Sequence, residues 1–120
     1  MAYTQKNFYE SAARTATPTA SVLQIDQDNL NAEIVIAVTA ATSTPSTVFN
    51  IEAQDGAGAW YVLLASVAIV GVGTTRLLLG PDITTSANVA QQGVLPDQIR
   101  CRPVHGNANS QTYTVQLRAR

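Results

Sequence analysis

Ionic side chains are scarce in this 120-residue chain. Charged residues make up 12% of it, about half of the roughly 25% that is usual for a soluble globular domain. The hydrophobic fraction of 46% is ordinary, so Thr, Ser, Asn, Gln and Ala stand where charges would otherwise be. Because ions resist dehydration, a surface with few of them is easily buried against another protein. The composition favours a chain that works in an assembly over a monomer with a Thr-rich β surface.

Cysteine, histidine and long apolar runs are scarce as well. A single cysteine cannot form an internal disulfide, and together with a single histidine it cannot supply a zinc site. The longest candidate for a membrane span, residues 57–75, is interrupted by glycines and hydroxyl residues, so we expect no membrane span. Residues 1–14 contain no apolar core of a signal peptide, so no secretory signal is predicted.

Motifs that would indicate catalysis are weak. Residues 71–75 (GVGTT) resemble a glycine-rich phosphate loop but lack its lysine. Cys101 falls on the apolar face of a predicted strand and His105 falls in the next loop, which favours a buried, inert thiol. Asp26 and Asp28 have no third acidic ligand at the spacing of a calcium loop. We therefore predict no enzyme activity and no catalytic, cofactor-binding or metal-binding residue.

The clearest structural pattern is a hairpin over residues 47–66. Phe49, Ile51 and Ala53 alternate with polar residues, which is typical of a strand with one dry face. Residues 55–58 (DGAG) suit a turn, and the aromatic and branched residues of 60–65 resume the strand. This hairpin contains the only tryptophan.

The rest of the chain shows short strand patterns and no full-length helix. Strands are predicted at 22–25, 31–41, 74–79, 98–104 and 112–119, with an apolar piece at 67–72 and one helical turn within 87–92. Seven or eight short strands with a turn about every ten residues predict an all-β fold. We expect a single antiparallel β-sandwich over residues 20–120, of immunoglobulin-like or jelly-roll type.

Residues 1–19 differ from the remainder. The tract 11–21 (SAARTATPTAS) consists of small residues that bury too little apolar surface to fix themselves in place. The sequence predicts an N-terminal arm, extended or disordered, with Tyr3, Phe8 and Tyr9 as its anchors on a partner. A frayed terminus is the alternative.

The charges are unevenly distributed, although the net charge is only −1. Residues 98–120 hold four arginines and no acid, whereas residues 20–97 hold seven acids and one arginine. We predict that the terminal strands form a basic face that contacts carboxylates of a partner through Arg100, Arg102, Arg118 and Arg120. The alternative is that Arg100 or Arg102 pairs across strands with an acid such as Glu52. Nucleic-acid binding is not expected, because the overall balance is not basic and aromatic platforms are lacking.

Four segments carry a family resemblance. They are 60–66 (WYVLLAS), 73–83 (GTTRLLLGPDI), 87–90 (ANVA) and 94–117 (VLPDQIRCRPVHGNANSQTYTVQL). Together they resemble small proteins encoded among the head-structural genes of tailed bacteriophages, over roughly residues 48–117. The resemblance implies a cement or decoration protein: a homotrimer, made in the host cytoplasm, that binds the major capsid protein on the capsid surface of the virion.

Two other functions stay open at the level of the sequence. The first is another structural part of the virion, in the tail, neck or fibre. The second is a carbohydrate-binding module in which Trp60 and Tyr61 would stack on a sugar, although a tryptophan near a hairpin is commonly a core residue.

Overall fold

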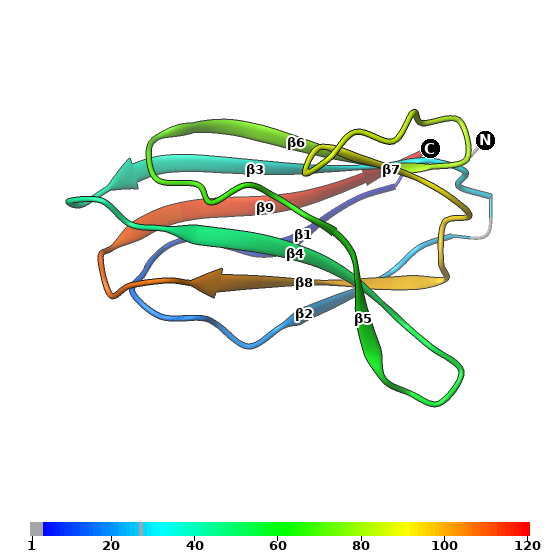
Figure 1. Cartoon of the computed structure of the whole chain (residues 1–120), viewed down its shortest axis with the longest axis horizontal. Coiled ribbons are helices and arrows are strands. Elements are labelled where there is room, and N and C mark those ends of the chain that lie inside the picture. Colours follow the sequence, from blue (N-terminus) through cyan, green and yellow to red (C-terminus); the bar gives the residue numbers. More distant parts are fainter. Residues whose placement is uncertain (1–3, 27) are drawn as a thin grey trace.

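The structure is a computed structural model that describes residues 4–26 and 28–120. These residues form nine β-strands in two layers (Figure 1). The strands are β1 (Thr4–Arg14), β2 (Ser21–Gln24), β3 (Ala32–Ala41), β4 (Thr47–Gln54), β5 (Trp60–Ala65), β6 (Gly73–Gly80), β7 (Ala90–Gln92), β8 (Gln98–His105) and β9 (Gln111–Ala119). The described residues contain no helix that could cross a membrane.

The two sheets confirm the predicted all-β class, and their arrangement is consistent with a β-sandwich. The five-stranded sheet has the order β1-β9-β3-β6-β7, and the four-stranded sheet has the order β2-β8-β4-β5. Every pairing of neighbouring strands is antiparallel except the one between β6 and β7.

The strand pairs follow a simple rule along the chain. Strands β4 and β5 pair as the predicted hairpin, and outward from it β3 pairs with β6, β2 with β8 and β1 with β9. Successive pairs alternate between the two sheets, as in one long hairpin folded so that its strand pairs fall in turn into each sheet. The turn at its tip is held by Asp55, whose Oδ1 accepts hydrogen bonds from the backbone N–H groups of Ala57 and Ala59 at 2.8 and 3.0 Å.

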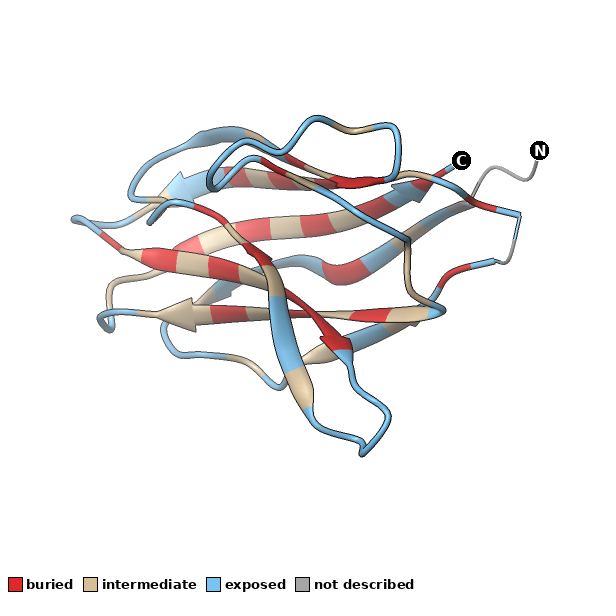
Figure 2. Ribbon diagram, turned by 45° about the vertical axis from the view of Figure 1, so that its right-hand side comes forward, coloured by how far each residue is buried: buried red, intermediate tan, exposed pale blue. Residues whose placement is uncertain are grey.

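The core lies between the sheets and is built from alternating residues of the strands. Figure 2 shows this alternation as buried and half-buried bands along β3, β4, β8 and β9. Each fully buried aliphatic or aromatic side chain contributes about 1.5–3 kcal/mol by leaving water. Among the largest fully buried side chains are Ile34, Ile36, Phe49, Ile51, Leu77, Ile99, Tyr113 and Leu117.

The N-terminal segment differs from the predicted arm. Its described residues form β1, which pairs with β9 from Thr4 opposite Ala119 to Arg14 opposite Gln111. The register shifts twice around Tyr9, so β1 is bulged there, and the adjacent residues Phe8 and Tyr9 are both buried in the core. A bulge breaks the alternation that would have revealed the strand. Tyr3, the third predicted anchor, lies outside the described residues.

The predicted helical turn within 87–92 is also absent. This segment contains a tight turn, in which the N–H groups of Val89 and Ala90 both donate to the carbonyl of Ser86, followed by β7. Asn88 has a φ of 62°, in the left-handed region that ends a right-handed helix. The apolar piece at 67–72 is a connection that contacts β4 through a single bridge between Thr47 and Ile69.

Candidate interaction surface

Arg100 and Arg102 face a carboxylate of their own chain. Glu52 is only 2% exposed. Its Oε1 accepts a hydrogen bond from Arg100 Nε at 2.5 Å, and its Oε2 accepts one from Arg102 Nε at 3.1 Å. The Arg100 guanidinium carbon also lies 4.6 Å from the centroid of the Trp60 ring. The alternative in which these arginines pair across strands with Glu52 is therefore confirmed.

The other two predicted arginines lie on β9 or just beyond it, in the other sheet. Arg118 Nη1 is 3.5 Å from Glu33 Oε1, and Arg76 makes an ion pair with the same carboxylate. The backbone of Arg120 forms hydrogen bonds with Leu30 and Asn31. Because β8 and β9 belong to different sheets, the four arginines do not form the one basic face that the sequence predicted.

Most exposed apolar side chains come from one stretch of the chain. Seven of the nine large hydrophobic residues that are exposed in the described chain come from residues 61–94. Between residues 56 and 96 the only charged residues are Arg76 and Asp82. We call this set the apolar side, and its members are Tyr61, Val62, Val67, Val70, Val72, Val89 and Val94.

Hydrogen bonds hold the segments that carry the apolar side. β5 is the end strand of its sheet, and the connection 66–72 continues from it along the open side between β4 and β6 (Figure 1). Thr47 and Ile69 exchange two backbone hydrogen bonds of 3.2 and 2.8 Å. Asn88 Nδ2 donates to the carbonyl of Ala65 at 3.0 Å, which ties the turn before β7 to the end of β5. The apolar side is thus a fixed surface.

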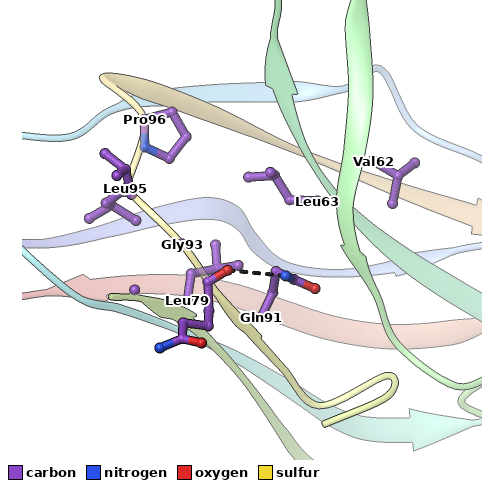
Figure 3. A pocket seen from close by; sticks show the side chains of 10 residues that line it. Val62, Leu63, Leu79, Gln91, Gly93, Leu95 and Pro96 are labelled. Atoms are coloured by element: carbon purple, nitrogen blue, oxygen red, sulfur yellow. Dashed lines mark hydrogen bonds between the residues drawn. The ribbon is translucent and has the colours of Figure 1, made fainter. Parts of the chain in front are cut away.

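A cleft of about 330 Å³ opens at one end of the apolar side, between β5 and residues 91–96. Figure 3 shows Leu63 pointing across it toward Leu95 and Pro96. Among the large hydrophobic residues of its lining, Val94 is the most exposed, at 91%. No ionisable side chain lines this cleft, whose lining consists of Val62, Leu63, Leu79, Gly80, Gln91, Gln92, Gly93, Val94, Leu95 and Pro96.

A second polar cluster lies where β1, β8 and β9 meet. His105 Nε2 is 2.9 Å from the hydroxyl of Tyr113, and the Arg14 guanidinium carbon lies 4.6 Å from the centroid of the Tyr113 ring. The hydroxyl of Tyr9 donates to the carbonyl oxygens of Thr19 and Cys101. Burial is the main cause that raises the pKa of Tyr9 to about 12, and burial also raises the pKa of Tyr113 well above its ordinary value. Both phenols are therefore neutral and serve packing.

His105 makes the stability of the fold depend on pH. Burial, and then the charge of Arg14, lower the pKa of His105 below its ordinary 6.5. The unfolded chain therefore binds the proton more tightly than the folded chain, and stability falls as pH drops below about 6.5. We expect the urea midpoint to be lower at pH 5 than at pH 7.5. The His105→Gln variant should lose that part of the difference, and an unchanged difference would contradict the assignment.

Cys101 confirms the predicted buried thiol. It is fully buried, and burial, followed by the charge of Glu52, raises its pKa far above the usual range. No group of three or more His, Cys, Asp and Glu side chains that could hold a metal ion occurs within residues 4–26 and 28–120. For the carbohydrate alternative, the Arg100 guanidinium lies over the Trp60 ring, which is half-buried, while Tyr61 is about half exposed.

The sequence interpretation missed the apolar side, although two signals pointed to it. The stretch 56–96 carries two charges in 41 residues. The valines at 67, 70 and 72 fall in the apolar piece 67–72, which the sequence does not assign to a strand. Comparison with protein-family models, with curated proteins and with solved structures found no match to this chain.

Proposed function

We propose that this chain is a structural protein of the virion that binds the outside of a tailed-phage capsid and stabilises the contacts between major capsid subunits. It acts as a cement or decoration protein, by adhesion and without catalysis. The observation that carries the proposal is the apolar side, a fixed surface with exposed valines and almost no charge. Protein interfaces are depleted of charge at their centre in the same way.

The strand order supports the proposal. Pairing β1 with β9, β2 with β8, β3 with β6 and β4 with β5, alternately in two sheets, is the order of a jelly roll. We propose that the sandwich is of that type, with β7 as an added strand. Jelly rolls build viral capsid domains but also lectins and cupins, so the fold is a supporting analogy and the surface carries the argument.

A cement function also fits binding through several weak contacts at once. A homotrimer on the capsid surface would present three apolar sides at once, and linked weak contacts give high avidity. In this arrangement the apolar side lies against the major capsid protein.

Binding to phage heads tests the proposal. Heads that lack the chain are mixed with the labelled protein, and bound copies are counted after sedimentation and located by cryo-electron microscopy. We expect saturable binding to the head, and at least a tenfold weaker affinity, about 1.4 kcal/mol, for the triple variant Val67→Ser, Val70→Ser, Val72→Ser. The matched control is Val22→Ser with Leu30→Ser, which changes exposed apolar residues outside the apolar side. Equal loss in both variants, or binding to the tail alone, would contradict the proposal.

Salt provides a second prediction. If apolar contacts dominate, binding to heads should change little, by less than about threefold, between low salt and roughly 0.5 M NaCl, where exposed charges are screened. A contact made mainly by arginines would instead weaken steeply. The measurement is the same sedimentation assay at several salt concentrations.

A further inference from the structure

The free edge of β5 is unusual for an end strand. Sheet edges in soluble proteins are normally protected by charged residues, proline or a covering loop. β5 has the sequence WYVLLA, with neither charge nor proline, and its residues Tyr61 and Val62 are about half exposed. Because β5 ends its sheet, one side of its backbone has no strand partner among the described residues. Its N–H and C=O groups on that side are a template for an added strand.

The space beside this edge limits what can fill it. The cleft lies between β5, at the end of one sheet, and residues 91–96, which begin in β7 at the end of the other sheet. Beyond the residues that line the cleft, Asn88 donates a hydrogen bond to the carbonyl of Ala65, and this bond joins the two segments that form its boundary. A second copy of the sandwich would bring its own second sheet, about 10 Å behind its edge strand, against this boundary. A single extended segment has no such bulk.

The chemistry of the cleft specifies the occupant further. Backbone groups of β5 need hydrogen-bonding partners, which a polypeptide in extended form supplies and a purely apolar ligand does not. The side chains that face the cleft, such as Leu63 and Leu95, are aliphatic, and none of the lining is ionisable. A charged segment would lose its hydration there without compensation.

We propose that the edge of β5 binds an uncharged, extended segment of a partner protein as an additional strand, with alternate aliphatic side chains of that segment in the cleft beside Leu63 and Leu95. The geometry of β5 and of residues 91–96 carries this inference, which holds whether or not the partner is a capsid subunit. It goes beyond the proposed function because it names the form and chemistry of the segment that is recognised.

A peptide titration of the full chain tests the inference without capsids. The probe is a blocked hexapeptide of alternating Thr and Val, followed by NMR of the backbone amides. We expect saturable shifts confined to residues 60–65 and 91–96, and slower hydrogen exchange in β5. N-methylation of the peptide amides that face β5 should weaken binding at least tenfold, because it removes the donors of the added strand.

Variants separate the cleft from the rest of the apolar side. Val94→Lys, at a highly exposed position, should weaken peptide binding about tenfold. Val72→Lys also replaces an exposed valine by lysine, but outside the cleft, and should leave peptide binding unchanged. No shift at residues 60–65 up to about 5 mM peptide, or shifts at β1 or β2 instead, would overturn the inference. A dimer of the chain alone that pairs through β5 would also overturn it. Peptide binding without head binding would contradict only the proposed function.

Discussion

Deletion of residues 1–15 is expected to prevent the domain from folding, and not only to remove an N-terminal arm. The deletion removes β1, which pairs with β9 along its length, and with it the buried side chains of Phe8 and Tyr9. Truncating a buried aromatic residue to alanine costs about 3–5 kcal/mol. Two such losses approach or exceed the total stability of a typical domain, about 5–15 kcal/mol. Circular dichroism should show no cooperative thermal transition.

Two variants of the full-length chain serve as controls for this result. Phe8→Ala with Tyr9→Ala should reproduce most of the destabilisation while keeping the chain length. Glu10→Gln, at an exposed position of the same strand, should change the free energy of unfolding by no more than about 0.5 kcal/mol. A truncated chain that unfolds cooperatively near the midpoint of the full chain would show that β1 is dispensable.

Replacing Arg100 and Arg102 together by glutamine is expected to lower the free energy of unfolding by about 3–5 kcal/mol. Both arginines hydrogen-bond to Glu52, whose side chain is almost completely buried. Without them the buried Glu52 carboxylate loses both of its ionic partners, and the cost of burying it uncompensated causes the loss. Urea denaturation at pH 7 measures the difference.

A third substitution in the same background tests the cause. Adding Glu52→Gln should restore most of the stability, because a cluster of neutral amides carries no buried ion. The matched control is Arg76→Gln, which breaks the exposed ion pair with Glu33 and should cost no more than about 1 kcal/mol. If the triple variant were no more stable than the double variant, packing and not charge would explain the effect.

Most of the fold could be predicted because most strands have one dry face. Residues 47–54 and 112–119 alternate between apolar and polar, residues 31–41 carry apolar side chains on both faces, and each stretch forms a strand. β1 escaped prediction because its bulge buries two adjacent residues and so removes the alternation. β7 escaped because three residues that pair in parallel with β6 carry no pattern of their own.

The surface was harder to predict, because it depends on pairing between distant parts of the chain. The sequence left two interpretations of Arg100, and only the register that places it opposite Glu52, 48 residues away, decides between them. Val62 is exposed because β5 is the end strand of its sheet. The local sequence does not encode which strand ends a sheet. The sequence interpretation proposed the arginines as partner contacts, whereas the structure points to the uncharged residues of the apolar side.

Hydrogen exchange of the chain bound to phage heads, compared with the free chain, tests the central claim most directly. Our account predicts that heads protect backbone amides within residues 60–72 and 88–96, on the apolar side, and leave β2 and β8 unchanged. Protection centred on the arginines of β8, or no protection at saturating concentrations of heads, would contradict it.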